Sequence, residues 1–170
     1  VTESTIGVNG DGSVEEVVIE SFDKEYYSLS DLTAYVNKQV DAFNQANPQE
    51  QPKDKESDDE EITAVSVHYV ETDPDAKTAA MALGYLNMDI YDAFNETDFE
   101  FLSMEEAASD ERIADIDGLV EVKSGEETTF KDLSEHKHLH LIYTDSSVRI
   151  QTNGKIMYYS KNVSLVDDHN

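Results

Sequence analysis

Three of the five histidines of the chain fall in one short stretch, Glu135–Tyr143, which reads EHKHLHLIY. The alternation predicts a strand in which His136, His138 and His140 share one face, since residues two apart in a strand lie about 7 Å from each other. Two such imidazoles, with a carboxylate from a neighbouring strand, would suit zinc or copper. The alternate leucines would take the core side, which leaves the histidines facing solvent or a partner. A metal site, an exposed strand face and a partner-binding face are therefore the three interpretations.

Other catalytic signals are absent from the sequence. It has no GxSxG motif and no glycine-rich phosphate loop. It has no cysteine, which excludes disulfides, thiolate metal sites and cysteine nucleophiles. The stretch NGDGS is similar to part of an EF-hand loop, but aligning Gly12 with the loop glycine puts Gly7 and Val18 at ligand positions that need carboxylates. We assign no catalytic residue and no cofactor from the sequence, and expect a non-catalytic protein.

The nine tyrosines offer a different kind of chemistry, because aromatic rings stack on sugars and other ligands. The pairs Tyr26–Tyr27 and Tyr158–Tyr159 are the clearest candidates for such a surface. The alternative is that they occupy half-buried strand positions, which use tyrosine freely, and the chain has no tryptophan.

Charge restricts the partners of the chain. Twelve Lys and Arg oppose 38 Asp and Glu, which gives a formal charge of −26. Phosphate backbones are bound by clustered cations, so we expect no nucleic acid partner, and an anionic membrane surface would repel the chain. The acidity favours solubility. A second interpretation is an acidic mimic of nucleic acid that inhibits a basic protein. No apolar run approaches the roughly 18 residues that a membrane-spanning helix needs.

The N-terminal third predicts a hairpin followed by one long helix. Two strand-like runs flank Asn9–Gly12, whose residue types suit a tight turn. Ser28 and Asp31 then resemble a helix-capping pair, and Asn47–Pro48 would end the helix. Apolar residues recur at helical spacing between these ends and predict a stripe that packs on a sheet: Leu29, Leu32, Val36, Val40 and Phe43.

The rest of the chain is mostly strand signal. Residues 49–61 hold no apolar side chain and predict a mobile acidic loop. A strand over 62–70 would put Val65, Val67 and Tyr69 on one face and His68 on the other. Further elements are expected as a strand at 78–86, a helix at 88–95, a strand at 99–104, a helical turn at 105–108, and strands in GLVEV, LHLIY, SVRIQ, KIMYYS and NVSLV. The sequence thus predicts a single α+β domain over 1–170, with antiparallel sheets of seven to nine strands, one main helix and one or two short helices.

The opening run TIGVNGDGSVEEVVIESFDKEYYSLSDLTAYV and the closing run NGKIMYYSKNVSLV carry a resemblance. Both resemble the uncharacterised lipid-anchored cell-surface proteins of gut Firmicutes and Clostridia, whose mature part starts with a similar hairpin and an acidic Asp-Lys-x-Tyr-Tyr segment. The resemblance implies export and a lipidated cysteine upstream of Val1, which would be the only contact with a membrane. It implies no activity and assigns no site residue. We therefore expect an extracytoplasmic, surface-attached domain that binds an unknown envelope or extracellular partner.

Overall fold

The computed structural model describes residues 3–50 and 62–167, and within them it contains four helices and ten strands. The α+β class is confirmed, with one long helix. The strands number ten rather than seven to nine, and three helices are short. The elements that the sequence analysis missed, β7 (Glu127–Thr128) and α4 (Phe130–Leu133), are too short to show a hydrophobic period. The mobile loop expected at 49–61 lies outside the described residues, apart from its first two.

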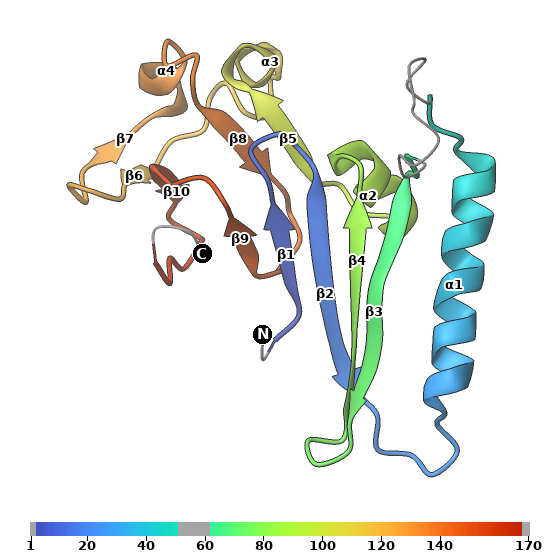
Figure 1. Ribbon diagram of the computed structural model, residues 1–170. Coiled ribbons are helices and arrows are strands. Elements are labelled where there is room, and N and C mark those ends of the chain that lie inside the picture. The colour runs from blue at the N-terminus through green and yellow to red at the C-terminus, as the bar shows by residue number, and fades with distance from the viewer. Residues whose placement is uncertain (1–2, 51–61, 168–170) are drawn as a thin grey trace.

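The largest sheet has five strands in the order β3-β4-β2-β1-β9 (Figure 1). Neighbouring strands pair antiparallel except β1 and β9, which pair parallel, so the prediction of purely antiparallel sheets is wrong at this edge. A parallel pair needs a long connection, and here most of the chain lies between the two strands. The five strands are β1 (Thr5–Val8), β2 (Val14–Ser21), β3 (Val65–Asp73), β4 (Thr78–Tyr85) and β9 (Ile150–Thr152).

Helix α1 (Leu29–Ala46) begins and ends where the sequence predicts. The Ser28 side chain accepts a hydrogen bond from the backbone N–H of Asp31, which satisfies a donor that the first helical turn leaves free. At the other end, the backbone N–H of Asn47 donates to the carbonyl of Phe43. Both ends are therefore capped by residues visible in the sequence.

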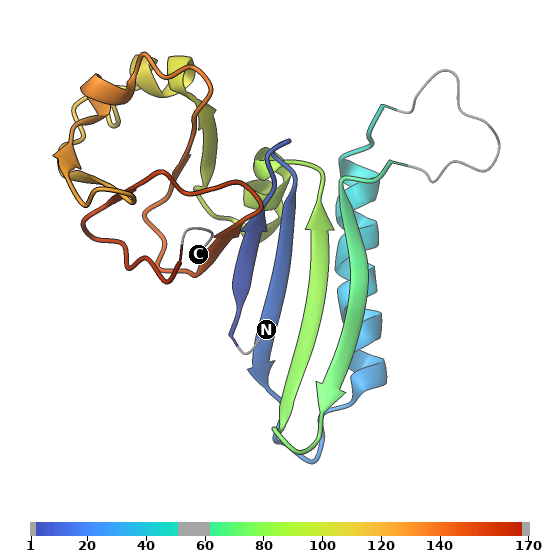
Figure 2. The ribbon, with the colours of Figure 1, turned by 60° about the vertical axis from the view of Figure 1, so that its left-hand side comes forward.

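The apolar stripe of α1 packs beside β3 on one face of the large sheet (Figure 2). Val36 and Val40 are buried, Leu32 and Phe43 are half-buried, and Leu29 is exposed. The predicted stripe is confirmed in its middle. It fails at Leu29, which is the first residue of the helix. Around this contact lies the core that we call the sheet core: Ile6, Val8, Val14, Val36, Val40, Ala64, Val65, Leu83, Tyr85, Met88, Tyr91 and Phe99.

Strand β3 contains a bulge that changes which side chains face the core. Its register with β4 shifts between Val67 and Tyr69, so His68 is an extra residue on the β3 side. After the bulge, Val70 packs on the sheet core, whereas Tyr69 is 41% exposed. The prediction that Tyr69 shares a face with Val65 and Val67 is wrong, because one inserted residue reverses the alternation.

The start of β3 is held to α1 by one side chain. The Asn44 amide donates to the carbonyl of Val65 over 2.8 Å, and the Val65 N–H donates to Asn44 Oδ1 over 2.9 Å. Because β3 is the outermost strand of its sheet, these backbone groups would otherwise lack a strand partner. Asn44 thus takes the place of a neighbouring strand at this position.

A second, smaller core lies beside the β1–β9 side of the large sheet, away from α1 (Figure 2). Two small sheets and two short helices surround it, and the predicted strand NVSLV is absent, because residues 162–166 follow an irregular path. Its elements are β5 (Glu100–Ser103) with β8 (His140–Tyr143), β6 (Leu119–Glu121) with β7 and β10 (Tyr158–Ser160), α3 (Met104–Ser109) and α4. Its buried residues are Met104, Ala107, Ile113, Leu119, Phe130 and Leu133. Helix α2 (Met88–Asn95) contacts both β4 and β5.

Candidate functional site

The three histidines do not line one strand. Strand β8 begins at His140, and His136 and His138 lie in the turn that follows α4. The backbone N–H of His136 donates to the carbonyl of Leu133, and the N–H of Leu139 donates to the carbonyl of His136. These turn hydrogen bonds prevent residues 136–139 from adopting the extended backbone of a strand. The alternating pattern of histidines therefore does not indicate a strand here. The predicted strand over all three histidines is therefore wrong, although all three side chains are exposed as expected.

The exposed rings are separated into two environments. The rings of His136 and His138 lie 5.9 Å apart and nearly perpendicular. The His140 ring stacks on Phe101, with centroids 4.9 Å apart. Within residues 3–50 and 62–167 no group of three His, Asp or Glu side chains is placed to hold a metal ion. The metal hypothesis stays a prediction without a third ligand to support it.

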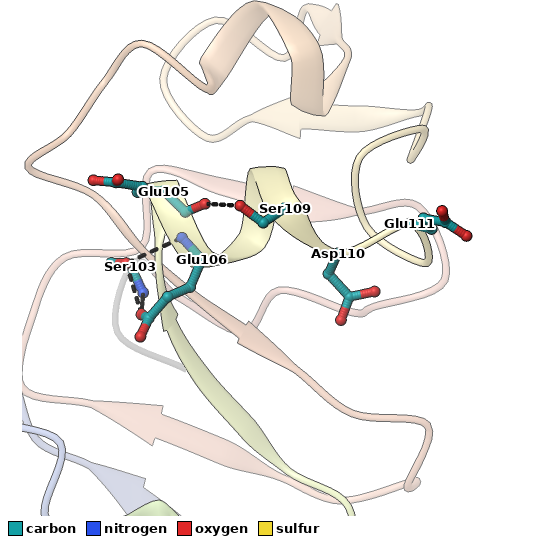
Figure 3. A pocket seen from close by; sticks show the side chains of 6 residues that line it. All are labelled: Ser103, Glu105, Glu106, Ser109, Asp110 and Glu111. Carbon is teal, nitrogen blue, oxygen red and sulfur yellow. Dashed lines mark hydrogen bonds between the residues drawn. The ribbon is translucent and has the colours of Figure 1, made fainter.

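An open depression of about 780 Å³ lies beside α3 and is lined by serines and carboxylates (Figure 3). The Glu106 carboxylate accepts hydrogen bonds from the backbone and hydroxyl of Ser103, which lower its pKa and cap the helix. Arg112 pairs with Asp110 and lowers the pKa of that carboxyl too. Figure 3 shows Glu105 and Glu111 pointing to opposite sides. These carboxylates serve the local structure and do not converge on a ligand.

A polar network in the sheet core was not found from the sequence. The hydroxyl of Tyr85 donates to the Glu16 carboxylate over 2.7 Å and accepts from Asn95 over 3.2 Å, and Tyr91 lies 3.5 Å from the other carboxylate oxygen. Both phenols are 3% exposed. Burial, and then the charge of Glu16, raises the pKa of Tyr85 and Tyr91 well above the ordinary value. Both therefore stay protonated and act as donors to one half-buried carboxylate.

A cavity of about 400 Å³ lies at the end of the large sheet where α1 begins. Its floor is Ala79–Met81 of β4, and one wall is formed by Asp31, Leu32 and Tyr35 of α1. The other wall comes from the end of β2 and the segment that leads into α1 (Figure 1), and is formed by Glu20, Ser21, Phe22, Tyr26, Tyr27 and Ser28. We call this cavity the aromatic pocket, because four aromatic side chains line it.

The ring of Tyr27 lies at the centre of the aromatic cluster. Its centroid is 5.0 Å from that of Phe22, with the planes at 34°, and 4.9 Å from that of Tyr26, with the planes at 77°. Tyr26 is 78% exposed, Tyr35 62% and Tyr27 42%. Isolated apolar residues on a surface are ordinary, but several exposed aromatic rings around one concavity mark a ligand-binding or interaction site.

The charge around the aromatic pocket is negative. Glu20 and Asp31 line it. Asp23 and Glu25 lie in the segment that forms its wall, and Lys24 in the same segment is paired with Asp23 over 3.1 Å. The first turn of α1 also adds its partial positive charge, which Asp31 offsets. The pocket therefore combines an aromatic surface with an excess of carboxylates.

The two tyrosine pairs noted in the sequence have different surroundings. Tyr26 and Tyr27 line the aromatic pocket, whereas Tyr158 packs on the second core and Tyr159 is half-buried in β10. A local signal separates them, since the first pair lies between a strand and a helix cap, and the second lies within a strand pattern. Phe22 and Tyr35 were missed, and Tyr35 lines the same pocket because α1 packs on the sheet.

The comparisons with known proteins do not extend this description. The chain matches no protein-family model, no curated protein sequence and no solved structure. Among the described residues, no helix has both the length and the apolar character needed to cross a membrane.

Proposed function

We propose that this chain is a non-catalytic binding domain displayed outside the cytoplasm, on a bacterial surface to which a lipid upstream of Val1 attaches its precursor. The aromatic pocket is the binding site. The export and the anchor follow from the resemblance of the two ends of the sequence to lipid-anchored surface proteins. Tyr26 and Tyr27, which end the Asp-Lys-x-Tyr-Tyr segment that carries part of that resemblance, line the pocket.

The observation that supports this function best is the exposure of Tyr26, Tyr27 and Tyr35 around one cavity. A tyrosine that is mostly exposed contributes little hydrophobic stabilisation, because that free energy scales with the apolar area removed from water. Packing within the domain therefore does not explain the cluster. Burial of the same rings by a ligand would remove much of their apolar area from water, and tyrosine is enriched where proteins bind partners.

The other two functions considered from the sequence stay predictions. Among the described residues no third side chain is placed to bind a metal ion with the histidines, and inhibition of a basic protein by acidic mimicry rests on the overall charge alone. Neither explains why aromatic rings gather at the end of the sheet.

The test is a titration followed by the backbone amide NMR signals of the domain, with soluble fragments of bacterial envelope polymers as the ligand mixture. We expect saturable shifts concentrated in residues 20–35 and 79–81. Tyr35→Leu should abolish them, whereas Tyr69→Leu, which changes an exposed ring of β3 outside the pocket, should not. Shifts confined to the histidine turn, or no shifts at all, would contradict the proposal.

A further inference from the structure

We infer that the aromatic pocket takes an organic ammonium ion whose charge is surrounded by methyl groups, with the trimethylammonium group of choline as the representative chemistry. This inference rests on the proposed function and deepens it by naming the class of ligand. Three features of the pocket support it: the angles between its rings, the sign of its charge and its size.

The ring angles favour a rounded cation over a flat sugar. A sugar ring stacks on one flat aromatic face, whereas a quaternary ammonium ion is bound by several faces arranged around it. Tyr27 makes angles of 34° with Phe22 and 77° with Tyr26, so the three rings do not form a single plane. Tyr35 lines the pocket from α1, a separate element. Rings that differ in orientation, together with Tyr35 from a second element, offer a ligand more than one aromatic face.

The charge favours a cation. Glu20 and Asp31 line the pocket, and no Lys or Arg is among its lining residues. The Lys24 ammonium, the basic group in the adjoining segment, is paired with Asp23. The chain as a whole carries −26, which raises the local concentration of small cations at low salt and lowers that of anions. An anionic ligand would meet repulsion from both the pocket and the rest of the molecule.

The composition and size of the pocket favour methylated over bare ammonium. Its floor, Ala79–Met81, and its neighbour Leu32 are apolar. A bare ammonium gains nothing from contact with this apolar surface and would lose water to reach it, whereas methyl groups gain from that contact. The volume of about 400 Å³ is at the low end of the range of ligand pockets, which suits a small ligand or one terminal group of a larger one.

The test compares choline with its neutral isostere, in which a tert-butyl group replaces trimethylammonium. Both have the same shape, so the difference in affinity measures the charge. Cation–π attraction of the size found in partly desolvated sites predicts that choline binds about tenfold more tightly. The affinity of choline should fall as salt is added, and that of the neutral alcohol should not. Calorimetry measures both affinities, and amide NMR shifts locate the site.

Two matched pairs of variants separate the contribution of an aromatic ring from that of a carboxylate. Tyr35→Leu should weaken choline binding about tenfold, and Tyr69→Leu should leave it unchanged. Asp31→Asn should weaken it severalfold, and Asp89→Asn, a first-turn carboxylate of α2 outside the pocket, should not. Tyr35 and Tyr69 are both exposed, so these variants should fold, and a melting curve checks this.

Phosphocholine distinguishes a free ammonium compound from an ammonium group that is part of a larger molecule. Tighter binding of choline than of phosphocholine indicates a free ammonium compound, whereas equal or tighter binding of phosphocholine indicates a headgroup or polymer substituent and keeps the ammonium chemistry. Equal affinity for choline and its neutral isostere at the pocket would overturn the inference and leave the binding function standing. Shifts absent from the pocket with every probe, including the envelope fragments, would overturn both.

Discussion

Replacing Asn44 with alanine should lower the free energy of unfolding by about 1.5 kcal/mol. Asn44 makes two hydrogen bonds to the backbone of Val65, at 2.8 and 2.9 Å, in a partly buried position. At about 1 kcal/mol each, their loss removes about 2 kcal/mol. Alanine is a better residue than asparagine inside a helix by about 0.5 kcal/mol, which offsets part of the loss.

Equilibrium denaturation in urea measures this change, and a melting curve should show a fall of about 3 to 6 °C for a chain of this size. Asn37→Ala is the matched control, because Asn37 lies on the same helix with its side chain exposed. It should leave stability unchanged or raise it by up to about 0.5 kcal/mol. If the Asn44 and Asn37 variants have the same stability, then Asn44 does not hold β3 to α1, and the assignment of its role is wrong.

Three further changes test the core and the carboxylates. Val36→Asp should unfold the domain, because it places a charge in the sheet core, and circular dichroism would show the loss of structure. Glu16→Leu should destabilise by about 1 to 3 kcal/mol in urea, because it leaves the Tyr85 hydroxyl without its acceptor. Asp98→Asn should raise the melting temperature at neutral pH. The hydrogen bond with Asp145 raises the pKa of Asp98, so the folded state binds more protons than the unfolded state, and wild-type stability falls as pH rises from the ordinary Asp value through the raised one. The variant should lack that fall in a pH series of melting curves.

Each of these changes has a counterpart that should be nearly neutral. Asn37→Asp puts a charge on the exposed side of α1, and Glu15→Leu alters an exposed residue next to Glu16. Asp115→Asn removes a carboxylate outside the Asp98–Asp145 pair. A change in stability in a control as large as in its test variant, and in the same direction, would show that burial and hydrogen bonding do not account for the effect.

The parts of the fold that the sequence predicts are those in which local chemistry decides the outcome. The α1 stripe repeats at the helical period between a serine cap and Asn47, and the first hairpin turns at Asn9–Gly12, so neighbours along the chain specify both. The bulge at His68 shows the limit of this reasoning. One extra residue reverses which side chains face the core, and no residue type in β3 marks where it occurs.

The candidate site likewise contains residues that local sequence identifies and residues that only the fold brings in. Tyr26 and Tyr27 attract attention in the sequence because they are adjacent, but Tyr35 reaches the same cavity only because α1 packs on the sheet. The histidine stretch is the opposite case. Its alternation is strong, yet the preceding helix α4 ends in a turn that takes up His136 and His138, so His140 alone starts the strand. A period of two indicates a strand only where the adjacent segments leave the chain free to extend.

The parallel pairing of β9 with β1 affects the order in which the chain folds. β9 joins the large sheet from the far end of the sequence, and the hydrogen bond from the Gly10 N–H to Asn153 Oδ1 joins residues 143 positions apart. Closing so long a loop is slow, whereas the hairpin, α1 and the β3–β4 pair need only shorter closures. During synthesis the first four strands and α1 emerge well before β9. Strand β1 therefore remains an unpaired edge of the sheet until β9 has been made. We expect the amides of β9 to gain protection from hydrogen exchange last during refolding.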